Sequence, residues 1–165
     1  MRRFGLKAAS LLALVFWTFG AAADTADQDI EPPVLVVADD TGEHAYTIQQ
    51  LRDIGEESFV TTTIWTEGVQ EFTGVPLHSF VKHLGLTEGE FTARAVNDYA
   101  ITFPVADALE EGAIIAYLRN GELMPVRDKG PLWIVYPFDS SPGFQTEVLH
   151  ARSIWQLERI EIGEQ

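Results

Sequence analysis

The pattern of apolar and polar positions predicts many short strands joined by tight turns. Residues 34–37 form an apolar run, residues 39–42 are turn formers, and residues 43–46 can return as a second strand. This arrangement is typical of a β-hairpin. Thr47 is a residue type that often caps a helix, and the spacing of the apolar residues after it predicts a short helix over residues 48–54.

The rest of the chain continues as a series of short elements. Asn120 and Gly121 form the dipeptide that favours a two-residue hairpin turn. Further helices are predicted at residues 78–84 and 104–111, and further strands at residues 58–65, 92–96, 100–103, 113–118, 123–126, 132–136 and 154–162. These elements predict a single α/β (α+β) domain, with short helices on a largely antiparallel or mixed sheet.

The N-terminus has the three parts of a secretory signal peptide. Residues 1–7 are cationic, residues 8–19 are apolar, and residues 21–23 are small, as a cleavage site requires. The twin arginine near the start also occurs in Tat signals, but the residues after it do not continue the Tat pattern. We therefore expect export to the periplasm by the Sec route.

The predicted domain organisation follows from this signal. Residues 1–23 are the signal peptide, residues 24–33 are an acidic, flexible leader, and residues 34–165 are the folded domain. No later apolar segment is long enough to span a membrane. We therefore expect no membrane insertion after the signal peptide is cleaved.

Net charge and cysteine content argue against several classes of function. The chain carries a net charge of −14, which becomes −17 once the three basic residues of the signal peptide are removed. Such a charge repels phosphate backbones and anionic lipids, which argues against nucleic-acid and membrane-surface binding. The chain has no cysteine, so disulfides, thiolate metal ligands and cysteine nucleophiles are excluded.

Catalytic and metal-binding patterns are weak in this sequence. No serine lies in a Gly-x-Ser-x-Gly motif, and no glycine-rich phosphate loop is present. His78 and His83 are five residues apart, so on one helix they point to different faces and do not form a metal-binding pair. We interpret both as surface histidines, and we expect no catalytic or metal-binding residue.

Binding residues are better represented than catalytic ones. Asn97, Asp98 and Tyr99 lie at the turn between two predicted strands, where amide and carboxylate groups can bind the edge of a flat heterocycle. Trp65, at the end of a predicted strand, is either a core residue or a ring that stacks on such a ligand. The sequence leaves both roles open for Trp65.

The stretch 127–137 combines a charged loop with a predicted core strand. Arg127 and Lys129 are two of only eight basic residues outside the signal peptide. They precede the turn formers Gly130 and Pro131, and an apolar, aromatic strand follows. This stretch is either an ordinary surface turn or the wall of a binding site, in which the two cations would anchor a polar or anionic ligand tail.

The order of several short motifs resembles a known family. The motifs are Phe72-Thr73-Gly74-Val75-Pro76-Leu77 before a helix, Asn97-Asp98-Tyr99, Ile115-Ala116-Tyr117, Asn120-Gly121-Glu122-Leu123, Gly130-Pro131-Leu132 and Val135-Tyr136-Pro137. In this order they resemble the molybdopterin-binding domain of the sulfite oxidase family, over about residues 34–162. The resemblance implies that family's fold.

Two departures from the family pattern change the expected function. The cysteine that ligates molybdenum in those enzymes would fall within residues 61–63, which are three threonines here. An arginine that commonly follows the Gly-Pro-x stretch is Trp133 in this chain. The chain is therefore similar to the small periplasmic pterin-binding proteins of this fold, and the expected ligand is a pterin rather than molybdopterin.

The resemblance also implies roles for individual residues. Trp65 or Trp133 would stack on the pterin ring. Asn97 and Asp98, beside Tyr99, would bind the amino-pyrimidine edge, where a carboxylate can form two parallel hydrogen bonds. Arg127 and Lys129 would contact the carbonyl group or the side chain of the ligand. These seven residues are the predicted binding site.

The resemblance finally implies a signalling partner. Pterin-binding proteins of this kind act on a membrane-anchored sensor enzyme that makes or breaks cyclic di-GMP. Two alternatives stay open on the sequence alone. One is an oxidoreductase that holds a molybdopterin cofactor without a cysteine ligand, and the other is an interaction module that kept the fold and binds no ligand.

Overall fold

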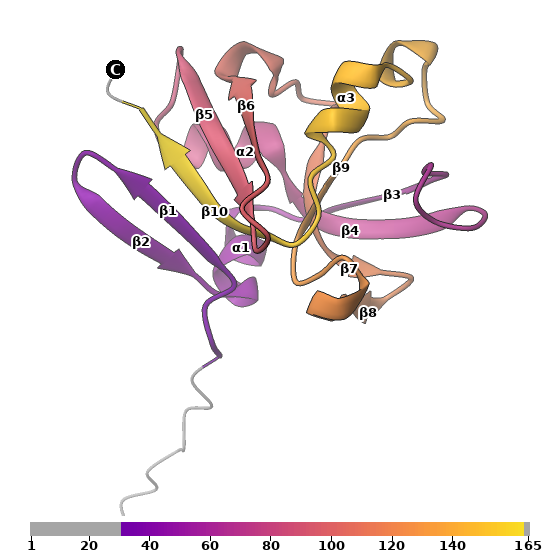
Figure 1. Ribbon diagram of the computed structural model, residues 1–165, viewed down its shortest axis with the longest axis horizontal. Coiled ribbons are helices and arrows are strands. Elements are labelled where there is room, and N and C mark those ends of the chain that lie inside the picture. The colour runs from indigo at the N-terminus through magenta and orange to yellow at the C-terminus, as the bar shows by residue number, and fades with distance from the viewer. Residues whose placement is uncertain (1–30, 164–165) are drawn as a thin grey trace, which may run out of the picture. The chain divides into compact units, whose positions relative to one another are not determined.

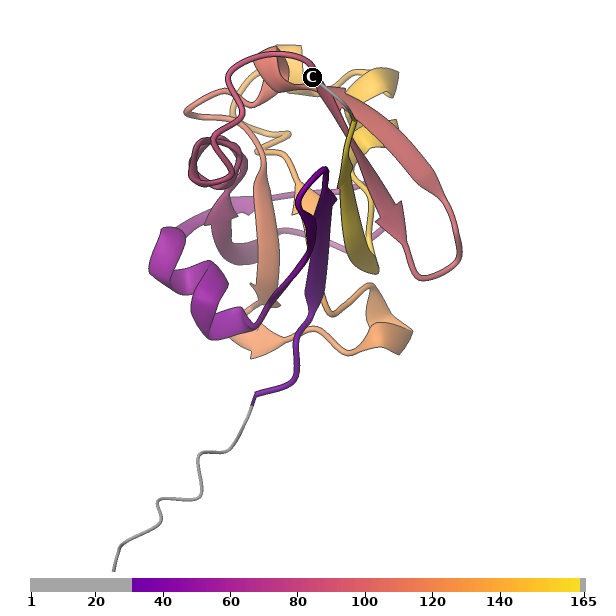
Figure 2. The same cartoon turned by 90° about the vertical axis from the view of Figure 1, so that its left-hand side faces the viewer.

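The computed structural model describes residues 31–163, which form two β-sheets and three short helices (Figures 1 and 2). These residues belong to one compact unit. The predicted signal peptide, residues 1–23, and most of the predicted leader, residues 24–33, lie outside the described residues. Within the described part of the chain, no helix is both long and apolar enough to cross a membrane.

The strands and helices are short. The strands are β1 (Leu35–Asp39), β2 (Gly42–Tyr46), β3 (Glu57–Thr61), β4 (Gln70–Pro76), β5 (Glu90–Ala95), β6 (Ala100–Pro104), β7 (Ile114–Arg119), β8 (Glu122–Leu123), β9 (Trp133–Val135) and β10 (Leu157–Ile162). The helices are α1 (Ile48–Ile54), α2 (Leu77–His83) and α3 (Glu147–Arg152), and single 3₁₀ turns lie at Val105–Asp107, Val126–Asp128 and Pro142–Phe144.

The first sheet joins the two ends of the described chain. Its strand order is β2-β1-β10-β5-β6. The pair β1–β10 is parallel, and the other three pairs of the sheet are antiparallel. Val37 of β1 faces Ile160 of β10 in this register, and both side chains are buried. The predicted hairpins over β1–β2 and β5–β6 are confirmed.

The second sheet has the order β3-β4-β7-β8, with β9 also paired to β7. β8 pairs with the end of β7 and β9 with its beginning, so both fit along the edge opposite β4. A register shift separates Thr73 from Gly74 in β4. A Cβ atom at Gly74 would lie 2.2 Å from the backbone oxygen of Ile115, so only glycine fits this close approach.

Helix α1 begins where its capping residue predicts. The Thr47 hydroxyl accepts a hydrogen bond from the Gln50 backbone N–H, and the Gln50 side chain accepts one from the Thr47 backbone N–H, which is a capping box for α1. α1 contacts both α2 and β4. Figure 2 shows α1 and α2 on the same side of the domain, at the left, with α3 at its upper end.

Residues from both sheets share a single hydrophobic core. Leu35 and Phe91 come from the first sheet, and Phe72, Ile115 and Trp133 come from the second, and all five are fully or almost fully buried. A core of this kind holds the domain together without disulfides, because the chain has no cysteine. It also fixes the strand ends from which the loops of the site emerge.

The structure corrects the predicted sheet and three predicted elements, and it adds one helix. The domain has two sheets rather than one, because β3, β4, β7, β8 and β9 pair separately from the rest. The predicted strand 58–65 ends at Thr61, and the predicted helix 104–111 is only the 3₁₀ turn Val105–Asp107. The predicted strand 154–162 begins at Leu157, and α3, just before it, was not predicted.

The two histidines predicted to be on the surface differ in exposure. His83 is exposed, whereas His78 is half-buried and its Nε2 lies 3.1 Å from the Ser79 hydroxyl. They come from the same helix, α2, and no group of acidic, histidine or cysteine side chains in residues 31–163 is arranged to hold a metal ion.

Candidate functional site

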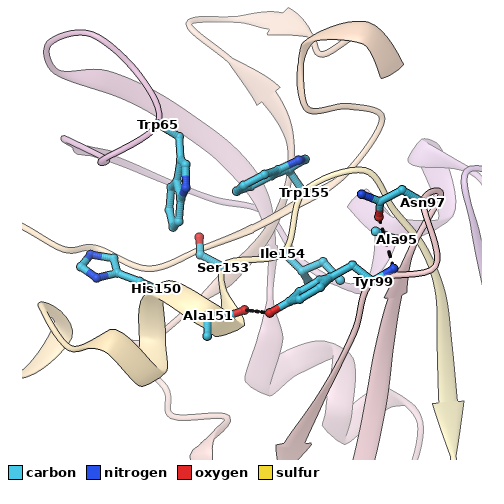
Figure 3. A pocket seen from close by; sticks show the side chains of 9 residues that line it. All are labelled: Trp65, Ala95, Asn97, Tyr99, His150, Ala151, Ser153, Ile154 and Trp155. Carbon is cyan, nitrogen blue, oxygen red and sulfur yellow. Dashed lines mark hydrogen bonds between the residues drawn. The ribbon is translucent and has the colours of Figure 1, made fainter.

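A cavity of about 400 Å³ lies where four segments meet: the loop after β3, the end of β5 and the turn after it, the end of α3, and the segment between α3 and β10 (Figure 3). We call it the main cavity. Its lining residues are Trp65, Ala95, Asn97, Tyr99, His150, Ala151, Ser153, Ile154 and Trp155. This volume is within the usual range for small-molecule sites.

Aromatic rings form much of the wall of the main cavity. The Trp65 ring centroid lies 5.3 Å from that of Trp155 and 5.8 Å from that of His150, with interplanar angles of 65° and 85°. Such edge contacts fix the ring orientations. Trp65, Trp155 and His150 are each half-buried, so part of each ring stays accessible. A flat ligand can therefore stack on these walls.

Trp133 lies beneath this wall and does not line the cavity. It is fully buried, and its ring centroid is 5.9 Å from that of Trp65 and 6.3 Å from that of Trp155. Its indole N–H lies 3.2 Å from both the carbonyl oxygen and the hydroxyl of Ser153. Trp133 thus packs beneath the half-buried Trp65 and Trp155 and holds Ser153 in place.

One hydrogen bond joins the turn after β5 to α3, and a second lies within the turn. The Tyr99 hydroxyl donates to the Ala151 carbonyl at 3.2 Å, and the Tyr99 backbone N–H donates to the Asn97 side-chain oxygen at 3.2 Å. Figure 3 shows the Asn97 amide nitrogen on the side facing Trp155. That nitrogen makes no hydrogen bond to any described residue, so it is available as a donor to a ligand.

The structure separates the seven predicted site residues into two groups. Trp65, Asn97 and Tyr99 line the main cavity. The other four do not: Asp98, Arg127, Lys129 and Trp133.

The three charged residues of the second group differ in their surroundings. Asp98 is exposed in the left-handed region, with φ of 64°, and Arg127 is exposed on a 3₁₀ turn. The ammonium group of Lys129 lies 5.6 Å from the ring centroid of Trp155. The positive charge of Lys129 therefore acts on a wall of the main cavity from outside.

A second cavity of about 230 Å³ adjoins the first. It is lined by Thr62, Thr63, Ile64, Phe138, Asp139, Gln145 and His150, so His150 borders both cavities. The Asp139 carboxylate accepts hydrogen bonds from the Thr62 backbone N–H and the Thr62 hydroxyl. These bonds lower the pKa of Asp139 below its ordinary value of 3.8, so the carboxylate is charged at neutral pH.

The three threonines of the loop after β3 are already hydrogen-bonded within the protein. The Thr61 hydroxyl accepts from the Asp139 backbone N–H at 3.1 Å, and the Thr62 hydroxyl donates to the Asp139 carboxylate at 2.8 Å. The Thr63 hydroxyl lies 2.8 Å from that of Thr66 and also accepts from the Trp65 backbone N–H. The loop is therefore held in place by hydrogen bonds to Asp139 and by hydrogen bonds within the loop.

Sequence reasoning missed the residues that α3 and the segment after it contribute to the main cavity. His150 and Ser153 lie in residues for which no element was predicted, and Trp155 lies near the start of the predicted strand 154–162. The signals for a helix were present, with Thr146 as a capping residue and Glu147 in the first turn. A helix of six residues is too short to show clear periodicity.

A comparison with protein families identifies the family of the domain. The sequence profile of the family described as oxidoreductase molybdopterin binding domain matches residues 41–143, which is more than half of the chain. The chain belongs to this family. No curated protein matches the chain significantly.

Only part of the lining of the main cavity comes from the residues that match the family of molybdopterin-binding domains. Trp65, Asn97 and Tyr99 lie within residues 41–143, whereas His150 and Trp155 lie beyond them. The expected resemblance to the sulfite-oxidase type of molybdopterin-binding domain is thus confirmed at the level of the family and its fold. The part of the wall formed by α3 and the segment after it lies outside the matched residues.

The residues present fit the pterin part of the family's cofactor but not its metal. Aromatic rings suit a flat pterin. The predicted molybdenum-ligand position, residues 61–63, holds hydroxyls that already have partners, and a hydroxyl is a poor substitute for a thiolate. No lysine or arginine lines either cavity, so the described lining lacks a cation for the phosphate of molybdopterin.

Proposed function

We propose that this protein is a periplasmic, non-catalytic pterin-binding protein that reports pterin occupancy to a membrane-anchored enzyme of cyclic di-GMP metabolism. The observation that carries the proposal is the main cavity, in which Trp65, Trp155 and Tyr99 surround a space of about 400 Å³. The domain belongs to a family that binds molybdopterin, whose ring system is a pterin. A free pterin is the part of that cofactor for which this cavity provides contacts.

In this proposal, stacking on aromatic side chains binds the pterin ring, and hydrogen bonds set the orientation of the ring in the main cavity. Aromatic side chains contribute about 0.5–1.5 kcal/mol per ring contact beyond the area that they bury. The Asn97 amide nitrogen is the donor that can bind a carbonyl or ring nitrogen of the ligand. Because Asp98 does not line the cavity, recognition of the ligand edge in this proposal rests on Asn97 rather than on Asp98.

A binding role accords better with the site than a catalytic one. The chain offers no cysteine to ligate molybdenum, and the hydroxyls of residues 61–63 already have partners, Asp139 for Thr61 and Thr62 and the loop itself for Thr63. The chemistry of these donors gives no support to redox catalysis at a molybdenum centre. The role proposed for the protein is therefore to hold the ligand rather than to transform it.

Reporting to a partner requires that a ligand touch parts of the protein that can move relative to each other. The main cavity is built from the loop after β3, the turn after β5 and α3, and the Tyr99–Ala151 hydrogen bond links the last two. A bound ring would contact all three and favour one relative placement. We propose that the outer surface of these segments is what the sensor enzyme recognises.

The experiment compares wild-type protein with the Trp65→Ala variant. The purified mature protein is titrated with tetrahydropterins while the quenching of tryptophan fluorescence is followed. We expect saturable binding to the wild type and at least a tenfold weaker affinity for the variant, because a stacking face is lost. Val148→Ala, at an exposed position on α3, is the control and should bind normally.

The Trp65→Ala variant also tests the proposed signalling role in the host. Cells that carry it in place of the wild-type gene should show the cyclic di-GMP level of a deletion strain. Cells that carry Leu123→Ala, at an exposed position on β8 outside the segments that line the main cavity, should match the wild type. Absence of binding across a panel of oxidised and reduced pterins would favour the ligand-free interaction module. Binding without any change in cyclic di-GMP would refute the signalling role alone.

A further inference from the structure

A third cavity, of about 170 Å³, lies on the other flank of α3 from the main cavity. It is lined by Asp107, Leu109, Gly112, Tyr136, Phe144, Leu149 and Arg152, and it shares no lining residue with the main cavity. Helix α3 borders both, because His150 and Ala151 line the main cavity while Leu149 and Arg152 line this one. We call it the tyrosine cavity.

Tyr136, which lines the tyrosine cavity, carries a hydroxyl group that the described protein leaves without a partner. Tyr136 is only 3 % exposed, and its hydroxyl oxygen is buried and makes no hydrogen bond to residues 31–163. Burial raises the pKa of Tyr136, so the hydroxyl stays protonated and is a donor at neutral pH. An unsatisfied buried hydroxyl destabilises the fold, and an acceptor that reached it from the cavity would recover this cost.

A guanidinium group lies in the same cavity and already has its charge balanced. Arg152 forms an ion pair with Asp107, and its side chain is 14 % exposed, against 45 % for Asp107. The guanidinium also lies 5.7 Å from the Phe103 ring centroid. An anion entering the cavity would add a second negative charge to this pair without a further cation to offset it, which is unfavourable in a partly buried site.

The remaining lining is apolar. Leu109, Phe144 and Leu149 provide hydrocarbon surface, and the Tyr136 and Phe144 ring centroids are 6.2 Å apart. A volume of about 170 Å³ is close to that of an engineered cavity of about 150 Å³ that holds a benzene molecule. The volume of the tyrosine cavity therefore suits a molecule whose apolar part is a single six-membered ring.

From these features we propose that the tyrosine cavity is a second binding site, for a small uncharged molecule with a ring-sized apolar body and one carbonyl oxygen. The carbonyl oxygen accepts the hydrogen bond of the Tyr136 hydroxyl, and the apolar body contacts Leu109, Phe144 and Leu149. This proposal does not depend on pterin binding, because the two cavities have no lining residue in common.

The test uses benzamide as the probe, with ¹H–¹⁵N spectra of the mature protein to locate binding. We expect saturable shifts at residues of the tyrosine cavity, and affinities at least tenfold weaker for benzoate, which is charged, and for toluene, which lacks an acceptor. Tyr136→Phe should weaken benzamide binding about tenfold, the loss expected for about 1.4 kcal/mol. Trp65→Ala, in the main cavity, should leave it unchanged.

A second variant, Leu109→Trp, is a control for the case in which Tyr136→Phe changes the fold itself. Leu109 is 57 % exposed, so Leu109→Trp can fill the cavity without disturbing the core, and it should abolish benzamide binding. Shifts that map to the main cavity, equal binding of benzamide and toluene, or undiminished binding by Tyr136→Phe would each overturn the proposal. So would a fall of more than about 4 °C in the melting temperature of Tyr136→Phe, because it would show that the hydroxyl has a partner in the fold.

Discussion

Asp139 connects the loop after β3 to the segment after β9. Its carboxylate accepts from the backbone N–H and hydroxyl of Thr62, and its backbone N–H donates to the Thr61 hydroxyl. The two segments are far apart in sequence, and both border the cavities of the site. Asp139 therefore helps to position Trp65, which lies three residues after Thr62.

This dependence gives a pH prediction. The folded-state pKa of Asp139 is below its value in the unfolded chain, about 3.9. Its stabilising effect is therefore present above that pH and is lost as pH falls through the folded-state pKa. We expect Asp139→Asn to melt at a lower temperature than the wild type at pH 7, with the difference closing below pH 4. Asp40→Asn, on the exposed β1–β2 turn, is the control.

The sequence predicted part of the site at the level of residues. Asn97 and Tyr99 line the main cavity because the predicted turn after β5 exists, but Asp98 lies between them and does not line it. Trp65 packs on Trp133 and also lines the main cavity, so its stacking on a ligand stays a prediction. Local patterns could not show that Trp133 lies one layer deeper, since this depends on which strands flank β9.

Helix α3 is the element on which the binding account depends most. It contributes His150 and Ala151 to the main cavity and is held to the turn after β5 by the Tyr99 hydroxyl. Its N-terminus is capped by Thr146, whose hydroxyl accepts from the Leu149 backbone N–H at 3.3 Å. So short a helix depends strongly on its cap and on its packing.

Two caps of the same residue type allow a matched comparison. Removing a threonine cap costs about 1 kcal/mol of stability. We expect Thr146→Ala to weaken pterin binding several-fold and to speed amide hydrogen exchange in α3. Thr47→Ala, which removes the cap of α1 away from the cavity, should lower global stability by a similar amount and leave pterin affinity unchanged. Equal affinities for both variants would contradict the role of α3.

Elements with strong local signals were predicted, and those set by distant contacts were not. Thr47 with Gln50 specified α1, and turn residues specified the hairpins β1–β2 and β5–β6. The division into two sheets depends on the parallel pairing of β1 with β10, which joins the two ends of the domain. No local pattern of apolar residues encodes such a pairing, so the sequence predicted a single sheet.

At the scale of the whole molecule, an acidic chain has a main cavity whose lining contains no Asp, Glu, Lys or Arg. The net charge is −14, yet none of the acidic residues that give this charge lines the main cavity, where His150 contributes an imidazole ring. A ligand bound there would be held mainly by stacking and by hydrogen bonds, which depend little on ionic strength. This combination suits a neutral, flat heterocycle better than a phosphorylated cofactor.

The most direct test of this account is native mass spectrometry, with metal analysis, of the protein purified from its own host. We expect one adduct per chain with the mass of a pterin, no molybdenum, and loss of the adduct in the Trp65→Ala variant. An adduct with the mass of molybdopterin together with stoichiometric molybdenum would contradict the account and favour an oxidoreductase.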